Sequence, residues 1–108
     1  LRRGRRKLEG HWVRSTYDRN IYEANLPELE SDSALVSIEF ELPARTQSAE
    51  IEIDGRRFLP TPYKLGASST LFTSPRFHHI VEAVLHLQGS NRPKQIPLVV
   101  KLWRKGRH

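Results

Sequence analysis

Two short segments of the chain alternate apolar and polar residues, and this alternation constrains the fold more than any other feature. In residues 36–42 four apolar residues are separated by one serine and two glutamates, and in residues 49–54 three apolar residues alternate with three acids. A period of two residues with one apolar face is typical of a half-buried antiparallel strand. We therefore predict two strands, joined as a hairpin by residues 43–48.

The segments on either side also favour strands. Residues 11–17 and 96–103 are rich in aromatic and β-branched residues, and residues 21–26 end at a proline. A chain of 108 residues has room for one compact core. The sequence therefore predicts a mainly β fold, a small antiparallel β-barrel or sandwich, in which residues 8–108 form a single β domain after a basic segment at residues 1–7.

Residues 75–88 fit two structures. Ser74 and Pro75 are a favourable start for a helix, and apolar residues follow at helical spacing. From Val81 to Leu87, however, every second residue is apolar, as in a strand. We favour the strand because the rest of the chain is β, and a helix would make the fold α+β.

The alternation also predicts which side chains form the core. The residues expected to be buried are Trp12, Val36, Ile38, Phe40, Ile51, Ile53, Leu85, Leu98, Val100 and Leu102. A core built from these strands would bury one face of each and leave the acidic face in solvent.

The predicted hairpin would bring like charges together. It sets two pairs of glutamates opposite each other, namely Glu41 with Glu50 and Glu39 with Glu52. Like charges directly opposite each other destabilise a sheet. We therefore expect a basic residue of the last strand, Lys101 or Lys105, close to one of these four carboxylates.

Positive charge is concentrated at the two ends of the chain. Of the 18 Lys and Arg residues, five lie in residues 1–7 and four in residues 101–108, whereas the 12 acids all lie between them. Basic residues beside a membrane anchor are typical of its cytoplasmic side. We expect a membrane-associated location on the cytoplasmic side; a solvated tail or a basic arm for nucleic acid is the alternative.

The sequence contains no recognisable catalytic or metal-binding pattern. It has no cysteine, and its five histidines lack the closely spaced partners of a zinc site. No nucleophile stands in a pattern with a base, and Gly66-Ala67-Ser68 is not a phosphate-binding loop. We therefore expect a protein that is not an enzyme and takes neither a cofactor nor a metal.

Two arginines share the expected inner face of the strands. Arg14 and Thr16 follow Trp12 at alternate positions, and continuing the alternation of residues 49–54 brings Arg57 inward as well. An inward guanidinium needs an anionic partner, and phosphate or carboxylate matches its paired donors. These four residues are the predicted ligand-binding residues. A bulge at the Asp-Gly pair before Arg57 would instead turn it to solvent and leave Arg14 paired with a carboxylate.

A short motif opens the predicted domain. Residues 8–12 read Leu-Glu-Gly-His-Trp, and this Gly-x-Trp step before antiparallel strands resembles the start of lipocalin-like small β-barrels. It is also similar to the soluble barrels that follow transmembrane helices in some bacterial antiphage effectors. The resemblance implies that Trp12 closes one end of the core, and that a membrane-tethered barrel senses a nucleotide signal in antiviral defence.

Two functions of different classes follow from these features. The first is a non-enzymatic ligand-binding or sensor domain, tethered to a membrane, that recognises a small anionic, nucleotide-like ligand or a protein partner. The second is a nucleic-acid-binding module that uses the basic termini, where Trp103 lies beside Lys101, Arg104 and Lys105. Because acids line the strongest predicted strands, we rank nucleic acid second.

Overall fold

The computed structural model describes residues 6–29, 34–60, 70–89 and 91–104, and every regular element among them is a β-strand. The strands are β1 (Arg6–Arg14), β2 (Ile21–Asn25), β3 (Ala34–Leu42), β4 (Ser48–Ile53), β5 (Arg56–Phe58), β6 (Thr70–Thr73), β7 (Ala83–Gln88) and β8 (Gln95–Arg104). The predicted mainly β fold is confirmed.

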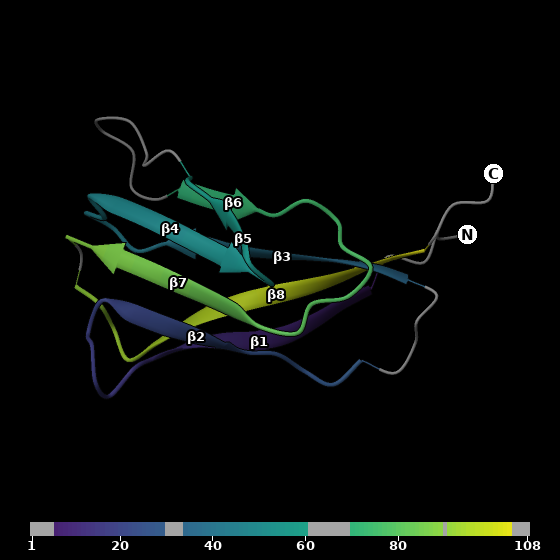
Figure 1. The fold of residues 1–108 in the computed structure, drawn as a ribbon, viewed down its shortest axis with the longest axis horizontal. Coiled ribbons are helices and arrows are strands. Elements are labelled where there is room, and N and C mark those ends of the chain that lie inside the picture. Colours follow the sequence, from purple (N-terminus) through teal and green to yellow (C-terminus); the bar gives the residue numbers. More distant parts are fainter. Residues whose placement is uncertain (1–5, 30–33, 61–69, 90, 105–108) are drawn as a thin grey trace.

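The eight strands form one antiparallel sheet that curls into a half-barrel (Figure 1). Their order is β5-β4-β7-β2-β1-β8-β3-β6, so β5 and β6 are the two edge strands. The curl brings these edges towards each other, because the rings of Phe58 on β5 and Phe72 on β6 have centroids 6.3 Å apart. One curled sheet, and not the two sheets of a sandwich, therefore surrounds the core.

The inner face of this sheet carries the core. All the predicted core residues are buried except Leu102, which is partly buried against the others. Trp12 has no exposed surface, and its ring meets that of Phe40 edge-on at a centroid distance of 5.2 Å. Tyr22 is equally buried, although its polar hydroxyl gave no reason to place it in the core. Alternation thus identified the buried face of each strand.

The predicted hairpin between the two alternating segments is wrong. β3 pairs with β6 and β8, whereas β4 pairs with β5 and β7, and the two strands stand in different parts of the curled sheet. The like-charge ladder is thereby avoided, because Glu50 lies opposite His86 and Glu39 lies opposite Val99. Alternation specifies which face of a strand is buried but not which strand is its neighbour.

Residues 75–88 form a strand only in their last six residues. β7 begins at Ala83, and the residues before it are irregular except for a bridge between Phe77 and Val36. Both Phe77 and Ile80 still pack against the core. The helical spacing of these apolar residues thus reflects an irregular segment that reaches the core twice, and the helix alternative is excluded.

The described start and end of the chain lie side by side. Arg6 on β1 pairs with Leu102 on β8, at the right-hand end of the sheet in Figure 1. The connections β1–β2, β3–β4 and β7–β8 lie at the opposite end. Within the described ranges, no helix has the length and apolar character needed to cross a membrane.

Candidate functional site

Arg14 lies on the inner face of the sheet, at the last position of β1. It pairs across the sheet with Tyr22, whose side chain is fully buried, so the two side chains share a face. Arg14 is half-buried, and its Nη1 donates a hydrogen bond to the carbonyl oxygen of Arg92 at 2.6 Å. The inward orientation predicted for Arg14 is present, and the partner it contacts there is a main-chain carbonyl.

Tyr22 holds the connection between β7 and β8 close to Arg14. Its hydroxyl donates to the carbonyl oxygen of Pro93 at 2.6 Å, and Arg92 Nη1 donates to Asn20 Oδ1 at 2.8 Å. Burial raises the pKa of the Tyr22 phenol, whereas the charges of Arg14 and Arg92 act in the opposite direction. The phenol therefore stays a neutral donor that fixes the connection beside two guanidinium groups.

Basic residues gather at this end of the half-barrel. We use the name basic end for residues 14–20, 43–47 and 91–94, which lie on the left in Figure 1. Its basic residues are Arg14, Arg19, Arg45, Arg92 and Lys94, and its one acid is Asp18. A main-chain hydrogen bond from Arg14 N–H to the Lys94 carbonyl joins two of these segments, and one from Gln47 N–H to the Gln88 carbonyl ties the third to the end of β7. Such a local excess of positive charge attracts anions.

Two arginines of the basic end have an unusual backbone conformation. Arg45 has a φ of 67° and Arg92 a φ of 54°, in the left-handed region that residues other than glycine rarely occupy. Each such residue costs of order 1–3 kcal/mol and persists only where its surroundings fix it. Residues of this kind cluster at binding sites, so the two arginines mark the basic end as a functional candidate.

Next to the basic end, the ladder between β3 and β8 stops before either strand does. Its last pair is Glu39 with Val99, although β3 continues to Leu42 and β8 starts at Gln95. Beyond that pair, β3 keeps only β6 as a neighbour, and β8 keeps only β1. The sheet therefore opens into a gap between two strands that are paired elsewhere.

Hydrogen bonds on the far sides of these strands show which residues face the gap. Arg14 N–H donates to the Lys94 carbonyl at 2.9 Å. The main-chain N–H and C=O groups of even-numbered residues at the start of β8 therefore point towards β1, and those of odd-numbered residues point towards β3. Ser74 N–H donates to the Ile38 carbonyl at 2.9 Å, so odd-numbered residues of β3 face β8. The main-chain groups along the gap thus belong to odd-numbered residues of both strands.

Each of the next two pairs that would be hydrogen-bonded in the interrupted ladder contains a proline. In continued register, Glu41 would pair with Pro97, and Pro43 would pair with Gln95. Each pair would need the N–H of a proline, so it would form one hydrogen bond instead of two. The prolines therefore account for the opening, and they leave the N–H and C=O groups of Glu41 and Gln95 facing the gap.

The opening forms an apolar groove of about 470 Å³. Its floor consists of buried core side chains from both strands, namely Phe40, Leu42, Ile96 and Leu98. At its mouth, Ala44 and Pro93 line the groove and lead directly into Arg45 and Arg92 of the basic end. A groove of this size with an apolar floor and polar groups at one end has the character of a small-molecule site.

The structure separates Arg57 from Arg14. Asp54 and Gly55, with φ values of 48° and 89°, form a two-residue turn, so Arg56 pairs with Ile53 and Arg57 pairs with Glu52. Arg57 consequently lies on the outer face, where it forms two hydrogen bonds to Glu50 at 2.9 and 3.2 Å. The inward orientation predicted for Arg57 is wrong, and the alternative holds for this residue: the chain reversal at the Asp-Gly pair shifts the alternation by one residue and turns Arg57 to solvent.

The same shift brings Arg56 to the inner face instead. Its guanidinium carbon lies 5.4 Å from the centre of the Phe58 ring and 5.1 Å from that of Phe77, beside edge strand β5. These cation–π contacts give the guanidinium an intramolecular partner. A two-residue turn at Asp-Gly is the sequence signal that would have found it.

Trp12 and Thr16, the other predicted ligand-binding residues, lie in different surroundings. Trp12 is enclosed by the core, and its Nε1 has no hydrogen-bond partner among the described residues. Thr16 is exposed in the turn after β1, so it no longer follows the alternation of the strand. Of the four predicted residues, only Arg14 stands at the basic end with its side chain on the inner face.

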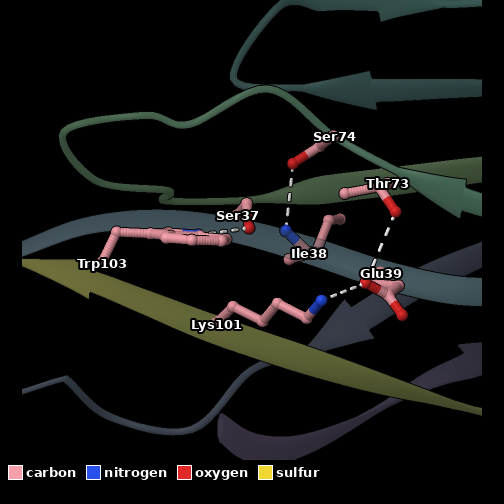
Figure 2. Close-up of polar contacts among 7 residues, drawn as sticks. All are labelled: Ser37, Ile38, Glu39, Thr73, Ser74, Lys101 and Trp103. Carbon is pink, nitrogen blue, oxygen red and sulfur yellow. Dashed lines mark hydrogen bonds and ion pairs between the residues drawn. The ribbon is translucent and has the colours of Figure 1, made fainter. Parts of the chain in front are cut away.

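The outer face of β3 and β8 carries a row of polar contacts (Figure 2). Lys101 Nζ lies 2.5 Å from Glu39 Oε1, and Thr73 contacts the same oxygen at 3.4 Å. The predicted basic neighbour is confirmed for Lys101, whereas Lys105 lies outside the described residues. The Lys101 hydrogen bond lowers the pKa of Glu39.

Trp103 in the same row is engaged within the chain. Its Nε1 donates to Ser37 Oγ at 2.9 Å, and the Arg76 guanidinium lies 3.7 Å from the centre of its ring (Figure 2 shows the Ser37 contact). A nucleobase that stacks on Trp103 would have to displace Arg76 or use the other face of the ring. This arrangement does not favour Trp103 as a stacking platform.

Comparisons with known proteins add no relatives. Neither protein-family models, nor curated proteins, nor solved structures gave a match to this chain. The site is therefore argued from its own geometry.

Proposed function

We propose that this chain is a non-enzymatic binding domain that recognises a small anionic ligand at the basic end. The observation that carries the proposal is the overlap of two features: Pro43, Ala44 and Pro93 line an apolar groove of about 470 Å³ and belong to the two connections that carry Arg45 and Arg92. A ligand with an apolar or aromatic body would occupy the groove, and its phosphate or carboxylate would meet the arginines. The nucleotide-like ligand and sensor role in antiviral defence implied by the resemblance are consistent with this chemistry and remain predictions.

Calorimetry on the whole chain with inorganic triphosphate tests the basic end directly. Arg14→Ala removes a guanidinium from it, and loss of charge-assisted hydrogen bonds should weaken binding by about tenfold or more. Arg57→Ala is the matched control, because it removes the same charge from an exposed position on the outer face. We expect its triphosphate affinity to stay within about twofold of wild type.

A second variant separates recognition from folding. Arg14→Ala also removes the hydrogen bond to the Arg92 carbonyl, so it could weaken binding by loosening the connection. Arg92→Lys keeps that carbonyl and the positive charge but loses the planar paired donors, including the Nη1 hydrogen bond to Asn20, so it should weaken triphosphate binding by several-fold with only a small fall in melting temperature. Equal losses in the Arg14 and Arg57 variants, or no binding by wild type, would overturn the proposal.

We further propose that the basic residues at the start of the chain serve membrane proximity and not ligand binding. The described start and end of the chain lie away from the basic end, which supports two separate roles. Replacing Arg2, Arg3 and Arg5 by serine should lower affinity for anionic vesicles by about 1 kcal/mol per residue and leave triphosphate binding unchanged. Loss of salt-sensitive single-strand binding in that variant would favour the nucleic-acid alternative.

A further inference from the structure

We infer that the groove between β3 and β8 reads a planar ring with an amide-type edge, one N–H beside one carbonyl oxygen, through the main chain of Glu41 and Gln95. The inference rests on the proposed function and names the part of the ligand that enters the groove. Its basis is the interrupted ladder, which leaves main-chain groups of both strands facing the gap along an apolar wall.

The groove offers donors and acceptors in a fixed arrangement. Glu41 and Gln95 each direct one N–H and one C=O towards the gap, as a strand does towards a missing neighbour. The Pro43 carbonyl on the same edge already accepts a hydrogen bond from Thr46 Oγ1 at 2.6 Å. A ring whose edge carries a donor next to an acceptor would satisfy such a main-chain pair, and its faces would contact the apolar walls.

A peptide strand fits this gap poorly. An added strand forms a continuous ladder with its neighbour, but Pro43 and Pro97 each remove a donor from the facing edges. The gap also closes at the pair of Glu39 and Val99. A short groove with one main-chain donor–acceptor pair on each side suits a ring and not an extended chain.

The charges around the groove set the direction of the ligand. Glu41 is exposed on the rim, nearer the end of the groove at which β3 and β8 are still paired. Ala44 and Pro93 line the other end, and the next residues along the chain there are Arg45 and Arg92 of the basic end. An anionic group of the ligand would therefore point to the basic end. The N–H groups of the ring would point the other way, towards Glu41 and the last pair of the ladder, Glu39 with Val99. A nucleobase joined to a phosphate meets both requirements.

Calorimetry with paired ligands tests this inference. The probes are inorganic triphosphate, UTP, GTP, and the two nucleotides methylated at the ring nitrogen that carries the edge N–H, N3 of uracil and N1 of guanine. We expect UTP or GTP to bind at least about tenfold more tightly than triphosphate, and its methylated form to lose most of that gain because the donor is gone and the methyl group clashes.

The outcomes separate the inference from the proposed function. If triphosphate, UTP and GTP bind equally, or if methylation changes nothing, the groove does not read the ring, and the inference fails while the anionic site stands. If none of the five probes binds, the proposed function fails and the inference falls with it. As a matched control, Leu71→Trp should narrow the groove at its rim and remove the gain from the ring without weakening triphosphate binding.

Discussion

The Lys101 ammonium lies 2.5 Å from the Glu39 carboxylate on the outer face of the sheet, although the two residues are not directly opposite each other in the ladder (Figure 2). Lys101 pairs with Ser37, so the contact with Glu39 runs diagonally between β8 and β3. Both side chains are mostly buried, with 15% and 21% of their surface exposed. The pair therefore fixes the two strands next to the point at which their ladder ends.

Acid should weaken the fold through Glu39. Because its pKa is lowered in the folded protein, chiefly by the Lys101 hydrogen bond, the pair stabilises the fold above the ordinary glutamate pKa, and that contribution is lost as the pH falls through the lower, folded pKa. Glu39→Gln leaves the mostly buried Lys101 ammonium without its carboxylate partner and should cost about 1–3 kcal/mol at neutral pH. It should also flatten the acid side of a stability curve measured by urea denaturation from about pH 7 to about pH 3.

Glu41→Gln is the matched control for this measurement, since Glu41 lies two residues along the same strand face and is exposed. Its acid dependence should follow that of wild type. If Glu39→Gln left the acid side of the curve as steep as before, the ion pair would not contribute to it.

Truncation of Phe40 should be costly because its ring is buried and contacts two other rings. Its exposure is 3%, and its ring centroid lies 5.2 Å from that of Trp12 and 5.8 Å from that of Phe72. We expect Phe40→Ala to lower the free energy of unfolding by about 3–5 kcal/mol in urea titrations. Val81→Ala, at a side chain that is 74% exposed, should stay within about 0.5 kcal/mol. Similar costs at both positions would contradict the described core.

Asp54 anchors the segment that leads into β7. Its carboxylate accepts hydrogen bonds from Val81 N–H at 3.0 Å and Glu82 N–H at 2.8 Å. Asp54→Ala should lower the free energy of unfolding by about 1–3 kcal/mol, since it removes these bonds at a residue with a φ of 48°.

Asp54→Asn provides the graded comparison, because asparagine keeps one acceptor oxygen and tolerates the left-handed conformation. It should therefore lose less stability than Asp54→Ala in the same denaturation experiment. An asparagine variant as unstable as the alanine variant would mean that the negative charge itself, and not the turn geometry, anchors the segment.

The sequence predicted the buried face of each strand better than it predicted which strands pair with each other. Alternation in residues 36–42 and 49–53 identified Ile38, Phe40 and Ile51 as core, because the apolar face of a strand is a local property. The partners of these strands depend on residues far along the chain, so the local turn at residues 43–48 misled the hairpin prediction. The pairing of Lys101 with Glu39 was right, although the like-charge ladder used to predict it does not exist.

The candidate site was only partly accessible from the sequence. Arg14 could be found because its face follows from Trp12, two residues earlier on one strand. The basic end combines Arg14, at the end of β1, with Arg45 and Arg92 on two separate connections, so no single stretch of sequence shows it. The groove did have a signal: Pro97 stands inside a predicted strand, where a proline marks an interrupted ladder.

Restoring the missing donor should close the groove. In Pro97→Val the main chain regains an N–H that faces Glu41, so Glu41 and the substituted residue would exchange two hydrogen bonds in continued register. The Glu41 amide should then exchange with deuterated solvent more slowly than in wild type, by about tenfold for each 1.4 kcal/mol of added protection. Pro93→Val, at a proline outside the ladder, is the control and should leave Glu41 exchange unchanged. The closed groove would also lose the affinity gained from a ring while keeping that for triphosphate. Unchanged exchange at Glu41 in Pro97→Val would show that something other than the two prolines holds β3 and β8 apart.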